Sequence, residues 1–124
     1  MNILSILETD LIDICIAILN EELDSIDINF HNMATVCKYA VPDGYPDKPV
    51  KNKQVDISGV DDLEKLFHAS IELKNNNLFQ IGSRAVAYVG IGETIWEAEK
   101  IAEKAISEVK GPLFHRKDIG TTDL

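Results

Sequence analysis

The sequence contains few cysteines, and its first 37 residues carry no positive side chain. Cys15 and Cys37 are the only two cysteines among 124 residues, and each lies in an apolar run. Two separated thiols support neither a disulfide framework nor a CxxC site, so we expect a reducing, cytoplasmic setting. The absence of Lys and Arg from residues 1–37 argues against a secretory or mitochondrial leader, because both need early positive charge.

Long hydrophobic runs and excess positive charge are missing as well. The most apolar stretch, residues 14–19, is far shorter than the ~20 residues of a membrane-spanning helix. The chain has 21 acidic and 12 basic residues, for a net charge of -9. This charge opposes the counterion release that drives nucleic-acid binding, and no basic stripe offsets it. We therefore expect neither a membrane nor a nucleic acid as a partner.

Motifs for metal binding and catalysis are also lacking. His31, His68 and His115 are far apart and form no HExxH-type spacing. The Gly90-Ile91-Gly92 run matches a dinucleotide fingerprint only superficially, because its third glycine would fall at Ile95. The sequence contains no Walker loop and no GxSxG elbow. We therefore predict no catalytic residue and no metal ligand within this chain.

The most informative stretch that is present runs from residue 82 to residue 97. Its apolar part, residues 85–89, predicts a strand buried on both faces, and Gly90 and Gly92 are interpreted as a sharp turn. Thr94 followed by Glu97 forms a capping box, which predicts the start of a helix over residues 94–110. The Gly111-Pro112 pair predicts its end.

The other predicted elements are short. The chain order is a helix over 2–20, a linker over 20–32, a strand over 34–41, a proline-rich loop over 42–49, an extended piece over 55–57, a helical turn over 58–64, strands over 66–73 and 78–81 joined by a turn at 74–77, and a tail over 113–120. These elements predict an α+β domain with a small, mainly antiparallel sheet and the 94–110 helix on one face.

The first predicted helix is too apolar for a helix that lies on one surface. Residues 14–19 are apolar on all sides, which indicates burial on several sides or contact with something that this chain does not contain. We therefore expect the chain to be part of a longer protein.

Arg84 is the main candidate for a binding residue. It follows Gly82-Ser83 directly, and a regularly alternating strand would place Arg84, Val86 and Tyr88 on one face. A planar guanidinium beside flexible backbone N–H groups favours contact with an anion or a phosphate. On the residues alone, the alternative is an arginine paired with a surface carboxylate.

Several segments, taken together, resemble a known family. The segments that carry the resemblance are Ala34-Thr35-Val36, Pro42-x-Gly44-Tyr45-Pro46, residues 82–86, residues 90–98 and Arg116-Lys117-Asp118-Ile119-Gly120. They occur in family order, and through them residues 33–124 resemble the C-terminal domain of phosphoribosylamine-glycine ligase (glycinamide ribonucleotide synthetase), of the ATP-grasp superfamily. Residues 1–11 also resemble the segment that follows the metal-binding run of this family.

The resemblance implies an activity for the intact enzyme. The family joins glycine to 5-phosphoribosylamine in purine biosynthesis and converts ATP to ADP and phosphate through a glycyl phosphate. Its Mg²⁺ or Mn²⁺ is held by a glutamate and an asparagine that precede this chain, so ATP and the metal are expected as cofactors of the intact ligase and not of this part alone. The isolated chain is not expected to be active.

The resemblance also implies a domain division and a site. Residues 1–32 would be a helix and linker at the end of the ATP-grasp core, and residues 33–124 would be the domain that caps the substrate. Arg84, helped by the backbone of Gly82 and Ser83, would bind the phosphate of phosphoribosylamine.

Four further residues receive expected roles from the resemblance. Lys38 and Tyr45 are secondary candidates for the substrate phosphate, and Arg116 and Asp118 are expected to lock the tail. A function from another class stays open: a non-catalytic binding or regulatory α+β module that associates through its first helix.

Overall fold

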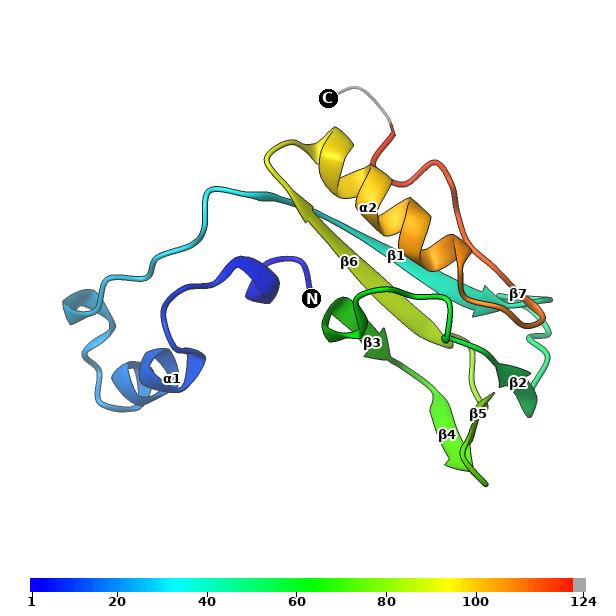
Figure 1. Cartoon of the computed structure of the whole chain (residues 1–124). Coiled ribbons are helices and arrows are strands. Elements are labelled where there is room, and N and C mark those ends of the chain that lie inside the picture. The colour runs from blue at the N-terminus through cyan, green and yellow to red at the C-terminus, as the bar shows by residue number, and fades with distance from the viewer. Residues whose placement is uncertain (122–124) are drawn as a thin grey trace.

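The computed structural model describes residues 1–121 and shows an α+β body with an N-terminal segment to one side (Figure 1). The main sheet has four antiparallel strands in the order β3-β6-β1-β7. These strands are β1 (Ala34–Pro42), β3 (Leu66–His68), β6 (Val86–Gly92) and β7 (Leu113–Phe114). The long pairing of β1 with β6 runs from Ala34 opposite Gly92 to Ala40 opposite Val86. The predicted fold class is confirmed.

A second sheet has three antiparallel strands in the order β2-β5-β4. They are β2 (Lys53–Val55), β4 (Ile71–Lys74) and β5 (Asn77–Gln80), and a short helical turn, η3 (Leu63–Lys65), precedes β3. The predicted turn between β4 and β5 is confirmed, since Asn75 and Asn76 have φ of +49° and +61°. The strand predicted over 66–73 is divided in two, because the chain bends at residues 69 and 70 where it passes from one sheet to the other.

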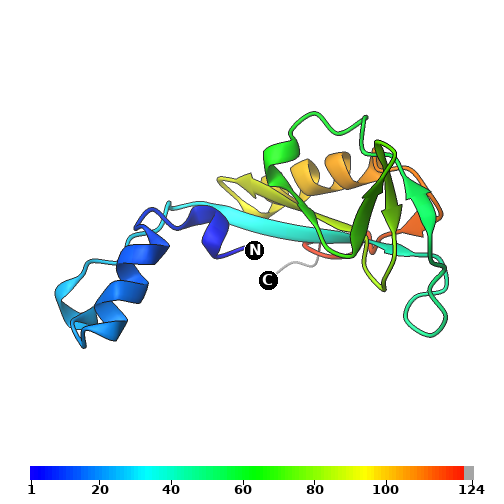
Figure 2. The same ribbon diagram turned by 90° about the horizontal axis from the view of Figure 1, so that it is seen from below.

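Helix α2 (Ile95–Ser107) lies across one face of the main sheet, as the view from below also shows (Figure 2). The Thr94 hydroxyl accepts a hydrogen bond from Glu97 N–H, and the Glu97 carboxylate accepts one from Glu93 N–H, so the helix starts as predicted. The predicted end is wrong. The last helical residue is Ser107 and Glu108 is the C-cap, because the following segment is drawn away into a bridge between Lys110 and Asp56 before it reaches Gly111.

The core lies between α2 and the main sheet. Strand β6 is buried as predicted: Tyr88 is 3% exposed, and Val86, Ala87 and Val89 are each 0% exposed. The interpretation of Gly90 and Gly92 as a turn is wrong, because both lie inside β6. Gly90 instead lets α2 approach, since a Cβ there would lie 1.9 Å from the Ala98 carbonyl oxygen. The core cluster comprises Val36, Ala40, Val60, Leu66, Val86, Tyr88, Ala98, Ala102 and Ile106.

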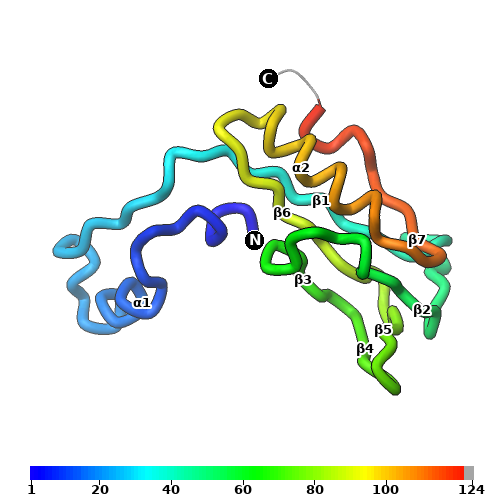
Figure 3. Tube along the Cα trace, viewed as in Figure 1, coloured from blue at the N-terminus to red at the C-terminus, as the bar shows by residue number. Residues whose placement is uncertain are grey.

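The N-terminal segment folds back on itself rather than forming one helix. It contains η1 (Leu4–Ile6), α1 (Leu11–Leu19) and η2 (Leu23–Ser25), and its trace doubles back beyond α1 (Figure 3). A bridge joins Leu7 to Phe30. The helix predicted over 2–20 is therefore too long. The Asp10 carboxylate accepts a hydrogen bond from Ile12 N–H and caps α1 at that point, while residues 7–9 are extended against residues 29–31.

Much of this segment exposes apolar side chains. Ile12 is 68% exposed and Leu19 is 83% exposed, and Ala17 is the only buried residue of α1. Such a surface is unusual for a segment that has no other partner. Within residues 1–121, no helix combines the length and apolar character needed to cross a bilayer.

Candidate functional site

Residues 81–85 link the second sheet to the main sheet and hold Arg84 between them. Ser70 N–H donates to the Arg84 carbonyl at 3.0 Å, and Ala85 N–H donates to the Ala40 carbonyl at 3.0 Å. Gly82 passes so close to Ser70 that a Cβ on the glycine would lie 2.5 Å from the serine hydroxyl oxygen. The backbone on both sides of the Arg84 side chain is therefore fixed.

The Arg84 side chain lies over the ring of Tyr39, with its guanidinium carbon 5.5 Å from the ring centroid. Tyr39 faces away from α2, since its neighbour Lys38 points toward that helix and strand residues alternate. The prediction that Arg84 shares a face with Val86 and Tyr88 is wrong. Those two side chains belong to the core beneath α2, whereas Arg84 precedes β6 and does not follow its alternation.

Arg84 and Tyr39 border a hollow of about 370 Å³, which we call the Arg84 hollow. Tyr45, one of the secondary candidates, lies in its wall, so the structure brings Arg84 and Tyr45 together. The other lining residues are Val41, Pro46, Phe114, Arg116 and Ile119, from β1, the proline-rich loop, β7 and the tail. The walls are therefore mainly aromatic and aliphatic, with two guanidinium groups.

The two arginines of the Arg84 hollow differ in their partners. Arg116 Nε donates to Asp118 at 3.0 Å and a second nitrogen forms an ion pair with the same carboxylate, which lowers the pKa of Asp118 below its ordinary value. This pair lies within the tail itself and does not lock the tail to another element. In contrast, none of the carboxylates within residues 1–121 forms an ion pair with Arg84.

The backbone at residues 82–84 offers unused donors, although only Arg84 of these three residues is among those that line the Arg84 hollow, and Gly82 and Ser83 are not. For the described part of the chain, no hydrogen bond is formed by the N–H groups of Gly82, Ser83 or Arg84, and residues 83 and 84 are exposed. Consecutive free N–H groups next to a cation form the type of surface that accepts anions. We call these three residues the anion cradle.

Lys38 lies on the opposite side of the sheet from Tyr39. Its amino nitrogen is 2.7 Å from Glu99 Oε1, 2.6 Å from Glu103 Oε2 and 3.0 Å from the Lys117 carbonyl oxygen. The side chain is 0% exposed. An ammonium group has three donors, and all three are already used here, so we do not include Lys38 in the proposed site.

The network around Lys38 joins three parts of the fold. His115 Nε2 lies 3.1 Å from both carboxylate oxygens of Glu103. Burial alone would raise the pKa of Glu103, but hydrogen bonds from Lys38 and His115 outweigh burial and lower it. The carboxylates of α2, the lysine of β1 and the tail are therefore held together by charge.

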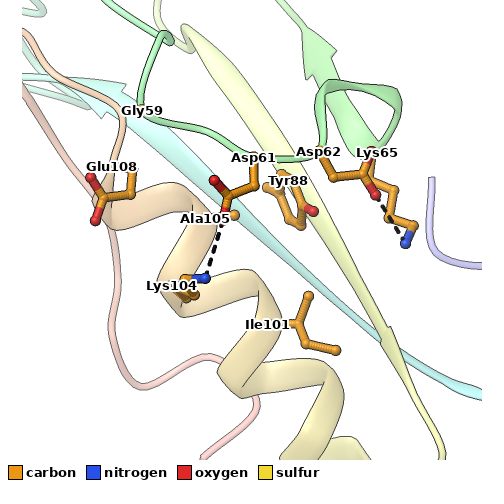
Figure 4. A pocket seen from close by; sticks show the side chains of 9 residues that line it. All are labelled: Gly59, Asp61, Asp62, Lys65, Tyr88, Ile101, Lys104, Ala105 and Glu108. Atoms are coloured by element: carbon orange, nitrogen blue, oxygen red, sulfur yellow. Dashed lines mark hydrogen bonds and ion pairs between the residues drawn. The ribbon is translucent and has the colours of Figure 1, made fainter.

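A second hollow, of about 260 Å³, lies on the α2 side of the sheet (Figure 4). Its two lysines are paired at the rim, Lys104 with Asp61 and Lys65 with Asp62, each at 3.2 Å. Tyr88 lies in its wall, and burial together with the nearby Asp62 raises the pKa of this phenol. Because the lysines already have acidic partners, this hollow is a poorer place for an anion than the Arg84 hollow.

The described residues contain no arrangement for covalent or metal chemistry that we can recognise. Burial raises the pKa of the Cys37 thiol, which disfavours the reactive thiolate. Across residues 1–121 there is no group of three or more His, Cys, Asp and Glu side chains that could hold a metal ion. The arrangement at the Arg84 hollow can bind and position an anion.

Sequence reasoning missed most of the Arg84 hollow. Tyr39 and Phe114 come from strands that meet only in the folded sheet, and neither belongs to a recognisable motif. The only available signal was alternation: once Lys38 is assigned to one face of its strand, Tyr39 must lie on the other. Nothing in the sequence shows that Arg84 leaves the alternation of its own strand.

The architecture defines a class of protein: an α+β domain in which one helix covers an antiparallel sheet. The same fold occurs in the crystal structure of a phosphoribosylamine-glycine ligase from Thermotoga maritima, with a TM-score of 0.63 and 24% sequence identity. The similarity covers 85% of this chain and 27% of that chain.

Sequence comparisons give the family. The model described as phosphoribosylglycinamide synthetase, C domain, matches residues 35–122. Phosphoribosylamine-glycine ligases from Methanococcus maripaludis and Methanocaldococcus jannaschii are 54% and 48% identical over 100% of this chain. The chain covers 29% of the length of each relative. The chain belongs to the phosphoribosylglycinamide synthetase C-domain family.

Proposed function

We propose that this chain is the C-terminal, substrate-capping part of an ATP-dependent ligase that joins glycine to 5-phosphoribosylamine. The relatives that match its whole length carry the name of this enzyme. A regulatory module that associates through the first helix is less well supported, because the similarity extends over both the N-terminal segment and the α+β body. In the ligase, the substrates are phosphoribosylamine and glycine, and the other partner of the domain is the remainder of the enzyme.

The Arg84 hollow is the proposed substrate site. The observation that carries this proposal is the Arg84 guanidinium, which is held over Tyr39 at the rim of a hollow and has no carboxylate partner within residues 1–121. Arg84 binds the phosphate of phosphoribosylamine, and the N–H groups of Gly82 and Ser83 complete the contact. Tyr45 lies in the wall and borders the sugar.

ATP and the divalent cation are assigned to the remainder of the ligase. The described residues provide no cluster of metal ligands, and the anion cradle has one free guanidinium, which suits a single phosphate better than a triphosphate with its metal. The role of this chain is to bind and orient the acceptor substrate.

Removing the guanidinium tests the site. In a complete ligase that carries this domain, Arg84→Gln is expected to raise the KM for phosphoribosylamine about 10- to 100-fold, because a hydrogen bond to a charged group contributes about 1.5–3 kcal/mol. The KM for ATP should change little. Steady-state kinetics with each substrate varied in turn measures both effects.

The matched control is Lys100→Gln. Lys100 also lies over an aromatic ring, that of Trp96 at 3.5 Å from its centroid, but on α2 and outside the hollow. The Lys100→Gln variant should leave the KM for phosphoribosylamine and the KM for ATP unchanged.

Variants of Tyr39 test whether its ring orients Arg84. Tyr39→Phe should preserve the KM for phosphoribosylamine, whereas Tyr39→Leu should raise this KM because it removes the ring. An unchanged KM in Arg84→Gln would remove Arg84 from the site.

The domain division is also a proposal. Residues 1–32 belong to the end of the ATP-grasp core, and residues 33–124 form the C-terminal domain, of which residues 122–124 lie outside the described structure. The support is the exposed apolar surface of the N-terminal segment, including Ile12, Ile16 and Leu19. In the ligase, this surface packs against the nucleotide-binding core.

The exposed surface leads to a prediction about the isolated chain. Without the core, the 124-residue chain is expected to self-associate at micromolar concentrations, because α1 has no cover for its apolar side chains. A version that contains only residues 33–124 is expected to remain monomeric. Sedimentation velocity over a range of concentrations distinguishes the two results. A monomeric full chain at high concentration would contradict the proposed burial of α1.

A further inference from the structure

We propose that the second hollow, which we call the Tyr88 hollow, binds a small zwitterionic amino acid. The ammonium group of this ligand pairs with the Glu108 carboxylate, and its carboxylate accepts a hydrogen bond from the Tyr88 hydroxyl. The inference does not depend on the proposed function, because the Tyr88 hollow lies on the α2 side of the main sheet and shares no lining residue with the Arg84 hollow.

The hydroxyl of Tyr88 carries the first step. The residue is 3% exposed and lies in the wall of the hollow, yet its hydroxyl forms no hydrogen bond with any other group in residues 1–121. Figure 4 shows its oxygen pointing toward the side of the hollow where Asp62 and Lys65 lie. The raised pKa described above keeps this hydroxyl protonated near neutral pH. It is therefore a donor that needs an acceptor.

Glu108 is the second lining group without a partner. Among the ion pairs of the described chain, none includes its carboxylate. The carboxylate lies against the loop before η3, since a Cβ placed on Gly59 would be 3.2 Å from Glu108 Oε2. In Figure 4, Glu108 and Asp61 lie on one side of Tyr88, and Asp62 lies on the other. The Glu108 side of the hollow therefore suits a positive group.

The ion pairs at the rim decide between ligands of different charge. Asp61 pairs with Lys104 and Asp62 with Lys65, so the lining has one carboxylate more than it has ammonium groups. A ligand that carries only negative charge would meet no free cation here. A ligand that carries only positive charge would leave the proton of the Tyr88 hydroxyl without an acceptor. A zwitterion satisfies both unpartnered groups and leaves both rim pairs intact.

The size and the floor of the Tyr88 hollow indicate which amino acid fits. Its volume of about 260 Å³ lies below the range of roughly 300–1,000 Å³ that is typical of drug-sized ligands, so the hollow suits a small molecule. Between the polar groups lie the Tyr88 ring, Ile101 and Ala105, which are apolar. Covering them with an aliphatic side chain removes apolar surface from water. A branched aliphatic amino acid such as leucine therefore fits best.

The test compares four probes on the 124-residue chain: leucine, isoamylamine, isocaproate and glycine. Isoamylamine lacks the carboxylate of leucine, isocaproate lacks the ammonium group, and glycine lacks the side chain. Leucine is expected to bind about tenfold more tightly than isoamylamine or isocaproate, because each of these loses one charge-assisted contact. Glycine should bind about fivefold more weakly than leucine or worse. Titrations followed by saturation-transfer NMR measure the four affinities.

Two variants assign the two ends of the ligand. Tyr88→Phe keeps the buried ring and should weaken leucine about tenfold while leaving isoamylamine unchanged, since that probe has no carboxylate. Glu108→Gln should weaken leucine by a similar factor and leave isocaproate unchanged. Glu108 is exposed, so this second variant tests the site even if Tyr88→Phe were to disturb the core.

Glu93→Gln is the matched control, because Glu93 is also exposed and without an ion pair in the described chain but lies outside the Tyr88 hollow. It should change none of the four affinities. Failure of leucine to bind, or binding of isoamylamine or isocaproate as tight as that of leucine, would overturn the proposal. Leucine binding that neither Tyr88→Phe nor Glu108→Gln weakens would also overturn it, because the ligand would then lie elsewhere.

Discussion

Gly90→Ala is expected to lower the free energy of unfolding by at least about 3 kcal/mol. The added Cβ would lie 1.9 Å from the Ala98 carbonyl oxygen and 2.8 Å from the Ala102 nitrogen. Both contacts are with the backbone of α2, so no side-chain rotation can relieve them. The helix would have to move away from β6 and thereby open the core around Ile106.

Chemical denaturation followed by circular dichroism measures this change. Gly59→Ala is the control, because its Cβ would meet Glu108 atoms only at 3.2–3.3 Å, a distance that a small shift relieves, and one of these atoms, Oε2, is the end of a flexible side chain. The control should lose about 1 kcal/mol or less. If Gly90→Ala were as stable as Gly59→Ala, the close approach of α2 to β6 would be wrong.

Lys38→Met is expected to destabilise the fold by about 3–5 kcal/mol, because it leaves the Glu99 and Glu103 carboxylates without their shared partner. The lysine side chain is fully buried, and the two glutamate side chains are 12% and 29% exposed. Their mutual repulsion would act in a region that water reaches poorly. Equilibrium unfolding at neutral pH measures the loss.

Two further variants separate charge from packing at this network. Lys38→Met combined with Glu99→Gln and Glu103→Gln should recover part of the loss, since no unpaired charge remains. Lys104→Met removes a lysine whose ion pair with Asp61 is largely exposed, and it should cost about 1 kcal/mol or less. Equal losses for Lys38→Met and Lys104→Met would show that the buried network contributes no more than a surface pair.

The same network predicts how stability depends on pH. Burial alone would lower the pKa of Lys38, but hydrogen bonds to Glu103 and Glu99 outweigh burial and raise it above its ordinary 10.5. The stability from Lys38 is therefore fully present below about pH 10.5 and is lost as the pH rises through the raised pKa. The pKa of Glu103 is lowered from 4.5, so its contribution is present above that pH and is lost as the pH falls through the lowered pKa.

Lys38 supports the Arg84 hollow indirectly, although its side chain does not line that hollow. Its bond to the Lys117 carbonyl holds the tail that supplies Arg116 and Ile119 to the wall. In Lys38→Met we therefore expect the tail to lose its anchor to β1. Lys38 contributes to the site through structure, rather than through contact with a ligand.

The sequence by itself determined the local elements whose causes are local. The capping box at Thr94 and Glu97, the asparagine turn at residues 75–76 and the buried strand before Gly90 each depend on a few adjacent residues, and all three are present in the structure. The family resemblance likewise depended on short segments in a fixed order, and the match over residues 35–122 confirmed it.

Only the tertiary structure decided which side of the sheet each charged residue occupies. Lys38 and Arg84 had both been predicted to reach a phosphate, yet Lys38 is buried under α2 while Arg84 lies over Tyr39 on the other face. The reason is physical. The pairing of β1 with β6 and the docking of α2 on β1 assign faces through contacts between residues that are 46 to 65 positions apart, and no local pattern contains that information.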